Sequence, residues 1–261
     1  MEFDLSLIDK EVQKKLYDDL LKGTLQNTGR ALETVSEFAF TPLFLLRLAN
    51  QASRKKFERA MLRLESEFSE HADTERVLPP IEIAEPILEE IVRVEDNQIS
   101  DMFVKLLANA SLNSSKGKVH RAFIATLKEM VPDEARILEH IKENRFVPVI
   151  QFMLDKYIPL SDRHCGLESK LNLAVPESIA LYMENLVRLG VIERFDGLIY
   201  SGSDKMYSEL IASYSHDGIA HAYKFDTLEP FKERERAFWT RGHYKLTPYG
   251  KSFRAACCVD Q

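Results

Sequence analysis

One region limits the fold of this chain more than any other, the stretch from Leu106 to Ile141. It contains the end of one helix, the turn sequence SLNSSKGK, a complete helix and a new helix start. Pro132 begins that last helix, because proline fits the first helical turn and the two acids after it stabilise the positive helix end. Only Val131 separates the two helices, so we expect them to be packed together, with a domain boundary at this point. The helix before the boundary is predicted from apolar residues at helical spacing, Val119, Phe123, Leu127 and Met130.

Residues 1–131 are predicted to form a helical bundle. Apolar side chains recur every three to four residues from Leu5 to Leu20, which places them on one helical face. A long helix is expected from Pro42 to about His71, and its second part is amphipathic. The apolar face of that part consists of Phe57, Met61, Leu64 and Phe68.

Residues 132–261 combine helices and strands in an order typical of a winged helix. A helix at 132–143 is followed by FVPVIQFML, which predicts a short strand or an apolar turn. A helix at 176–189 comes next, with proline at its start and glycine at its end. The sequence VIERFDGLIYS then predicts two strands joined by the Asp196-Gly197 turn.

An insertion is expected near 203–230, within the wing. The closing sequence HYKLTPYGKSFRAACC predicts a strand followed by a helix that starts at the Thr-Pro step. The predicted fold class is therefore mainly α, with an N-terminal helical bundle followed by a winged-helix-like α+β domain that carries a small β hairpin or wing.

The composition favours a cytoplasmic protein. The chain has three cysteines in 261 residues and a formal net charge of −6, and so few cysteines argue against a disulfide scaffold. The opening sequence MEFDLSLIDKEVQKK has acids where a signal peptide has basic and apolar regions. The longest apolar run, from Phe38 to Leu46, is interrupted by a Thr-Pro step and is shorter than the roughly 20 residues of a spanning helix.

Four stretches resemble the abortive infection alpha family, and together they span nearly the whole chain. They are LYDDLLKGTLQNTGRALETV (16–35), the region from LPPIEIAEPILEEI to ISDMFVKLLANA (78–110), VHRAFIATLKEMVPDEARIL (119–138) and YKLTPYGKSFRAAC (244–257). The resemblance implies a bacterial protein of phage defence that halts or kills the infected cell. It implies no catalytic residue. One departure is Lys22-Gly23, where the family pattern has a proline-containing turn.

No metal site or catalytic site is predicted. His164-Cys165 and Cys257-Cys258 are adjacent pairs, whereas zinc ligands are usually two to four residues apart. The sequence has no nucleophile elbow, zinc-protease helix, phosphate-binding loop or dinucleotide fingerprint. We therefore expect no cofactor and no enzymatic activity.

The basic C-terminal tail is the best candidate for nucleic-acid contact. Residues 231–254 contain seven basic and two acidic side chains, a net charge of +5, whereas residues 1–100 have a net charge of −7. Cations contact phosphates, and aromatic rings stack on bases. Against this, the helix at 176–189 offers only Arg188 as a base-reading cation, and the tail could instead pack on the acidic half. The predicted contact residues are Lys232, Arg234, Arg236, Trp239, Arg241, His243, Lys245 and Lys251.

The apolar segment from Phe38 to Ala49 has two interpretations. The first is a helix buried in a bundle or at a dimer contact, because apolar helical stripes are usually core. The second is a membrane-seeking segment of a cell-killing effector. The residues predicted to contact a partner or a membrane are Phe38, Phe40, Leu43, Phe44, Leu45 and Leu46.

These patterns lead to three functional hypotheses. We favour a non-enzymatic antiphage effector or sensor that acts through contacts with a protein partner or within a homo-oligomer. The alternative is a winged-helix regulator that binds nucleic acid through the basic tail. A second alternative is a membrane-perturbing, toxin-like effector.

Overall fold

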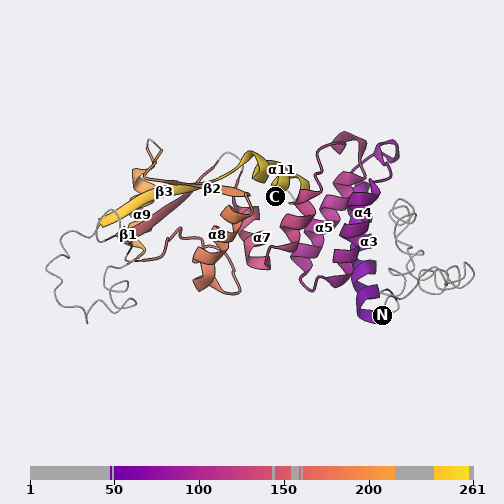
Figure 1. Ribbon diagram of the computed structural model, residues 1–261, viewed down its shortest axis with the longest axis horizontal. Helices are drawn as coiled ribbons and strands as arrows, with labels where there is room; N and C mark the ends of the chain where they lie inside the picture. Colours follow the sequence, from indigo (N-terminus) through magenta and orange to yellow (C-terminus); the bar gives the residue numbers. More distant parts are fainter. Residues whose placement is uncertain are drawn as a thin grey trace, which may run out of the picture. The chain divides into compact units, whose positions relative to one another are not determined.

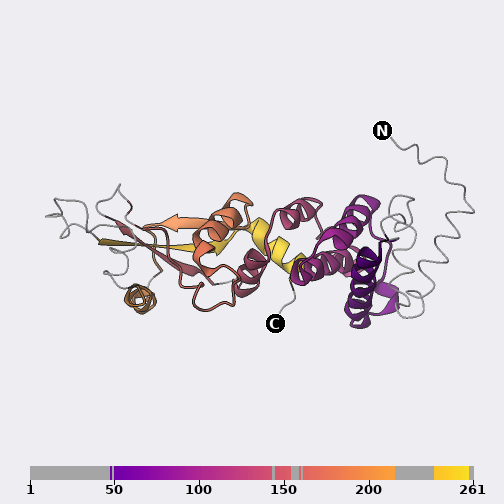
Figure 2. The ribbon, with the colours of Figure 1, turned by 90° about the horizontal axis from the view of Figure 1, so that it is seen from below.

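The computed structural model shows a mainly helical protein with a small antiparallel sheet (Figures 1 and 2). This confirms the predicted predominance of helix. The chain divides into two compact units, the first formed by residues up to Pro132 together with the C-terminal end from Ser252, the second by Asp133–Lys251. The domain predicted at 132–261 includes this C-terminal end, and packing of the basic tail on the acidic half was the alternative. The structure describes residues 48, 50–142, 145–153, 159, 161–200, 202–214 and 238–258.

The first unit is built on helices α3 (Gln51–Ser69), α4 (Ile81–Arg93), α5 (Asn97–Ala110) and α6 (Ala122–Lys128). Helices α3, α4 and α5 all pack against one another. Asn50 begins α3, because its side-chain oxygen accepts a hydrogen bond from the amide of Ala52 at 2.8 Å. The face of α3 predicted to be apolar is buried, namely Phe57, Met61, Leu64 and Phe68.

The turn after α5 forms where the sequence predicts it, with a 3-10 turn at Asn113–Ser115 and Gly117 at φ 80°. The helix expected from Val119 begins later, at Ala122. The C-terminal end of the chain also packs in this unit. Phe253 meets Phe123 edge-on, with ring centroids 5.5 Å apart, and the Asn109 amide donates to the Ala256 carbonyl at 2.9 Å.

The second unit begins with α7 (Pro132–His140), shorter than the predicted 132–143, and contains α8 (Ile179–Arg188) and α9 (Asp204–Ala212). Its strands are β1 (Val147–Met153), β2 (Ile192–Asp196) and β3 (Phe238–Leu246), in the sheet order β1-β3-β2. The central strand β3 is antiparallel to both neighbours. Helix α11 (Pro248–Cys257) follows β3 at the Thr-Pro step, as predicted.

The prediction of a hairpin at Asp196-Gly197 is right for the first strand, β2, but wrong for the second, because residues 198–200 form no strand. β2 pairs with β3, which lies much later in the chain, and not with the residues directly after Gly197. Gly197 has φ 73° and its amide donates to the Arg241 carbonyl at 2.9 Å, so the chain leaves the sheet after this last bond. The next side chains are exposed, namely Leu198, Ile199 and Tyr200.

Candidate functional site

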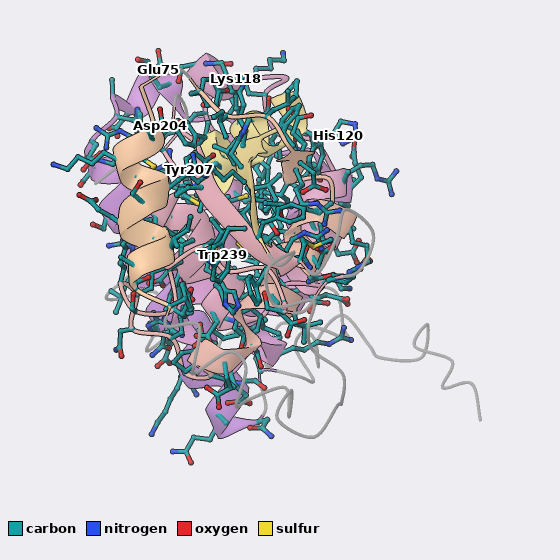
Figure 3. All side chains as sticks on the ribbon, turned by 90° about the vertical axis from the view of Figure 1, so that its left-hand side faces the viewer. Glu75, Lys118, His120, Asp204, Tyr207 and Trp239 are labelled. Carbon is teal, nitrogen blue, oxygen red and sulfur yellow. The ribbon has the colours of Figure 1, made fainter. Side chains whose placement is uncertain are left out.

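The predicted binding residues of β3 lie on one face of the sheet. Trp239, Arg241, His243 and Lys245 alternate along the strand, and side chains two residues apart point the same way. Helix α9 packs next to β1. It lies on this side of the sheet, because Arg241 lies over the ring of its Tyr207 and Trp239 packs against the cluster that Tyr207 belongs to (both labelled in Figure 3). These residues therefore do not form an open basic surface.

Arg241 is held by α9. Its guanidinium pairs with Asp204 at 3.1 Å and lies 5.7 Å from the centre of the Tyr207 ring. The Tyr207 hydroxyl donates to the Gly242 carbonyl at 2.6 Å, and Tyr207 is fully buried with Ile150 and Leu210 in a small core. The positive charge of Arg241 is therefore compensated within the second unit.

His243 is only 5% exposed and lies in an aromatic cluster. Its ring stacks on Phe195 with centroids 4.9 Å apart, and Tyr200 and Phe146 lie at 4.8 and 5.5 Å. Its Nδ1 atom is 2.9 Å from the Leu198 carbonyl oxygen. This histidine fixes the loop after β2 against the sheet, and a nucleic acid could not reach it without local opening.

The remaining tail residues differ in position. Trp239 packs on Phe152 with ring centroids 5.0 Å apart, and Lys245 is half-buried in register with Glu193. Lys251 is half-buried on α11. Nucleic-acid contact through these residues stays a prediction, and three further tail residues lie outside the described part of the chain, Lys232, Arg234 and Arg236.

The outward face of α8 is acidic and apolar. We define the α8 face as Glu177, Leu181, Glu184 and Arg188, which recur at helical spacing and are all exposed. Leu181 is the most exposed large apolar side chain among the described residues, at 67%. The opposite face is buried as the sequence predicts, through Ile179, Tyr182, Met183 and Leu186.

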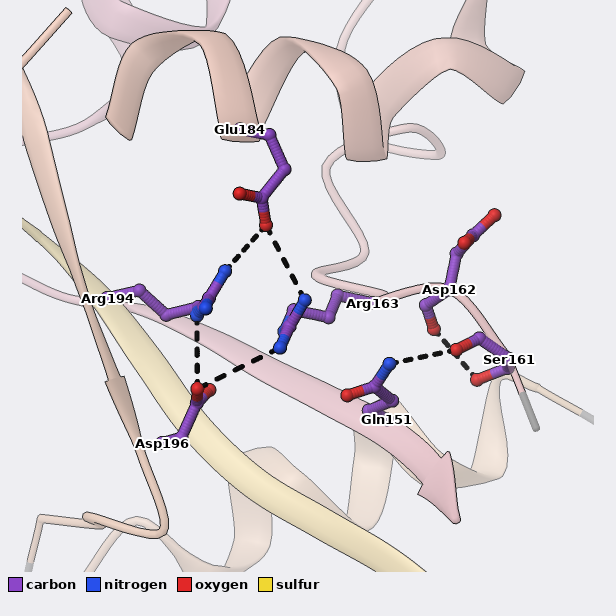
Figure 4. Close-up of polar contacts among 7 residues, drawn as sticks. All are labelled: Gln151, Ser161, Asp162, Arg163, Glu184, Arg194 and Asp196. Carbon is purple, nitrogen blue, oxygen red and sulfur yellow. Dashed lines mark hydrogen bonds and ion pairs between the residues drawn. The ribbon is translucent and has the colours of Figure 1, made fainter. Parts of the chain in front are cut away.

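Four charged side chains form a closed ring next to the α8 face (Figure 4). Glu184 pairs with Arg194 at 2.6 Å and with Arg163 at 3.5 Å, and Asp196 pairs with the same arginines at 3.1 and 3.8 Å. Burial alone would lower the pKa of Arg194, but the two carboxylates raise it above its ordinary value. The ring is electrically neutral, so its arginines add no net positive charge beside α8.

Two buried acids at the start of α7 position α8. Asp133 accepts hydrogen bonds from the backbone amides of Ala174 and Val175, which lie just before α8. Glu134 accepts a hydrogen bond at 2.8 Å from the side chain of Asn185 on α8. In the sequence these acids indicate only a favourable helix start. Their role in holding α8 depends on tertiary contacts, which the local sequence does not show.

A family model described as abortive infection alpha matches residues 49–257, which is most of the chain. The chain belongs to this family. The family indicates a function related to abortive infection. A comparison with curated proteins gave no match. Among solved structures, the chain is similar to an uncharacterized protein from the hydrocarbon-degrading marine bacterium Alcanivorax borkumensis SK2, with 17% identity and a TM-score of 0.37 over 53% of this chain and 93% of that chain.

Three of the four stretches that resemble the abortive infection alpha family fall inside the matched residues. The stretch at 16–35 precedes them and lies outside the described residues, as does the Lys22-Gly23 departure. The residues predicted to contact a partner or a membrane also lie outside the described residues, namely Phe38, Phe40, Leu43, Phe44, Leu45 and Leu46. Within the part of the chain that the structure describes, no helix has both the length and the apolar character to cross a membrane.

The three cysteines of this abortive infection alpha protein are buried. Cys165 is 2% exposed, and burial raises the pKa of its thiol to about 12. Burial also raises the pKa of Cys257, with Cys258 adding to the shift. His164 lies beside Cys165 in sequence but its ring packs on Tyr214, with centroids 4.3 Å apart. In the described residues, no group of three or more His, Cys, Asp or Glu side chains is placed to hold a metal ion.

A second group of basic side chains lies in the second unit, and the sequence does not single it out. They line a pocket that we call the basic pocket, with His140, Lys142, Arg145 and Lys170 among its walls. Lys142 and Arg145 follow α7, where positive residues are expected as ordinary helix-end neighbours. Their grouping with Lys170 depends on a loop that returns to β1, so no local sequence pattern predicts that these three residues lie at one pocket.

Proposed function

We propose that this abortive infection alpha protein acts without catalysis, through contacts that the α8 face makes with a partner protein. The second unit would serve as the contact module of a phage-defence effector or sensor. The observation that carries the proposal is the composition of the α8 face, in which an exposed leucine stands beside two carboxylates.

The winged-helix interpretation is supported by the order and pairing of the elements. Helix α8 directly precedes β2, β2 pairs with β3, and β1 borders β3 on the other side. In winged-helix proteins the helix before the wing is the one that enters the major groove. We therefore infer that α8 takes the position of the recognition helix, with the segment between β2 and β3 as an enlarged wing.

The chemistry of the α8 face favours protein over duplex DNA. Base readout depends on Arg, Lys, Asn or Gln directed at the groove, and carboxylates are repelled by phosphates. Here Glu177 is exposed, Glu184 is exposed but paired with Arg163 and Arg194, and the Arg188 side chain donates to Asn185 on its own helix at 2.9 Å. Val175 adds a second exposed apolar side chain, 41% accessible, at the same end of α8 as Leu181. Exposed apolar groups rimmed by charges are typical of protein contact sites.

The proposed lack of catalysis rests on the state of the reactive groups. The buried thiols are held in the protonated form by their raised pKa values, and the thiolate is the nucleophilic form. The one histidine beside a cysteine in the sequence has its pKa lowered by burial and packs on a tyrosine ring. A role in binding therefore agrees better with these side chains than a role in covalent chemistry.

Leu181→Arg is expected to abolish phage protection while the protein stays folded. An arginine at an exposed position costs little stability, about 0.5 kcal/mol or less, but it places a charge in the centre of the proposed contact. The measurement is plaque formation on cells that express the full-length variant, with thermal unfolding of the purified protein alongside. Plaque numbers should rise to the level of cells without the gene.

Leu62→Arg is the matched control, because Leu62 is 51% exposed on α3 in the first unit. Protection should survive in this variant. Equal protection by Leu181→Arg and the unchanged protein would overturn the role of the α8 face. Salt-sensitive binding of duplex DNA by the full chain, with contacts mapped to α8, would instead support the nucleic-acid regulator.

A further inference from the structure

The basic pocket lies in the second unit, between the end of α7, the start of β1, the 165–170 loop and α9, and has a volume of about 260 Å³. Beside the pocket the Arg145 amide donates to the Lys142 carbonyl at 3.1 Å, and the Lys170 amide donates to the Leu167 carbonyl at 3.0 Å. None of the lining residues belongs to α8. The pocket is therefore separate from the α8 face.

The charged residues that line the basic pocket all have the same sign. Four of the lining residues are basic or histidine and none is acidic. Lys142, Arg145 and Lys170 are exposed and form no ion pair with any described residue, although the whole chain has a net charge of −6. The other arginines of this unit discussed above, Arg163 and Arg194 among them, are paired with carboxylates.

Two acids stand close to the pocket residues in space or in sequence. Glu168 lies 3.9 Å from the thiol of Cys165, which lines the pocket; burial raises the pKa of this glutamate, and the positive charge of Lys170 opposes that rise. Glu143 stands between Lys142 and Arg145 in the sequence but lies outside the described residues. Three cations gathered around one concave site repel one another, and a bound anion would remove that repulsion.

The rest of the wall is apolar. Phe146, Val147, Leu167 and Met206 contribute to it. Phe146 is stacked on Tyr200 with ring centroids 4.5 Å apart. Pockets that join a few charged groups to apolar walls are typical of small-ligand sites, and 260 Å³ lies just below their usual range of about 300–1,000 Å³.

We propose that the basic pocket binds a phosphate-bearing ligand, with the phosphate held by Lys142, Arg145 and Lys170 and an apolar or aromatic portion against the Phe146 side. Arginine matches phosphate geometry with paired hydrogen bonds, and lysine adds a compact charge. Such a ligand would give the phage-defence protein a chemical input distinct from its protein contact.

Two sources could supply this chemistry. One is a free phosphate compound such as a nucleotide. The other is an anionic lipid headgroup, because Tyr200, which stacks on Phe146, and its neighbours Leu198 and Ile199 are exposed and could meet a membrane surface. The shared chemistry is the phosphate, and the experiment separates the sources.

The test uses the full chain and two sets of probes. Inorganic pyrophosphate and adenosine monophosphate are each titrated into the protein by calorimetry. Co-sedimentation of the protein is measured with phosphatidylcholine vesicles that contain or lack phosphatidylglycerol. The pocket variant carries Lys142→Gln, Arg145→Gln and Lys170→Gln. The control carries Lys55→Gln, Lys118→Gln and Arg121→Gln, which are exposed in the first unit and change the net charge equally.

The pocket variant is expected to bind at least about tenfold more weakly, since each lost charged hydrogen bond alone is worth that factor, whereas the control keeps its affinity. Binding of the soluble probes, or of phosphatidylglycerol vesicles alone, supports the proposal and identifies the source. Absence of binding to all probes overturns it, as does an equal loss in both variants, which would indicate unspecific charge attraction. Thermal unfolding confirms that both variants are folded, as expected for exposed side chains.

Discussion

Gly250→Ala is expected to destabilise the second unit by about 3 kcal/mol. Gly250 lies in α11, and a Cβ atom there would overlap the Val191 carbonyl oxygen and come within 2.8 Å of the carbonyl carbon. Both are backbone atoms, so they cannot turn away as the end of a flexible side chain can. The Thr247 hydroxyl donates to the Gly190 carbonyl at 2.6 Å and accepts from the Gly250 amide at 2.8 Å, which holds the two segments close together.

The sign of this effect is informative. In a helix with open space, Gly→Ala stabilises by up to about 1 kcal/mol, because alanine has the higher helix propensity. Urea unfolding followed by tryptophan fluorescence measures the change, since Trp239 is the only tryptophan and lies in the second unit. Ser208→Ala, at an exposed position of α9 in the second unit, is the control and should shift stability by less than about 0.5 kcal/mol. A stable Gly250→Ala protein would show that the close approach to Val191 is not required.

Elements with a strong local period could be predicted from the sequence. The buried face of α3, with Phe57 and Leu64, and that of α8, with Tyr182 and Leu186, follow from helical spacing alone. The Thr-Pro step predicts the start of α11 because proline favours the first helical turn. In each case the pattern that determines the element lies within the element itself.

Strand pairing and the sites depend on residues far apart in the chain. The Asp196-Gly197 turn suggests a local hairpin. In the structure the nine-residue strand β3, much later in the chain, pairs with both β1 and β2 instead. For the same reason the sequence does not show how the tail cations are packed and paired. Only the structure reveals that α9 covers Arg241, and that a loop brings Lys170 to the pocket lined by Lys142.

Asp133→Ala is expected to cost about 3 kcal/mol of the stability of the second unit. Asp133 is 3% exposed, and its carboxylate accepts hydrogen bonds from the Ala174 amide at 2.9 and 3.0 Å and from the Val175 amide at 3.1 Å. Alanine would leave these amides without the carboxylate. The loop that leads into α8 would then lose its attachment to α7. Arg136→Ala removes the half-buried ion-pair partner and should cost much less, about 1 kcal/mol or below.

The contribution of Asp133 should depend on pH in one direction. Burial alone would raise the pKa of this carboxyl, but the amides of Ala174 and Val175, with Tyr182 and Arg136, together lower it below its ordinary value. Because the folded pKa is below the unfolded value of about 3.9, the unfolded chain binds the proton first as the pH falls. The stabilisation is therefore present above about pH 5 and is lost as the pH falls through 3.9 toward the lowered folded value.

Urea unfolding of the unchanged protein and of Asp133→Asn, measured from roughly pH 7 to pH 3, tests this dependence. Asparagine keeps an acceptor oxygen but cannot titrate, so the difference in stability between the two proteins should shrink as the pH falls. A difference that stays constant over this range would mean that the charge of Asp133 does not hold the loop. In that case the attachment of α8 to α7 would depend on the Glu134–Asn185 hydrogen bond and on apolar packing.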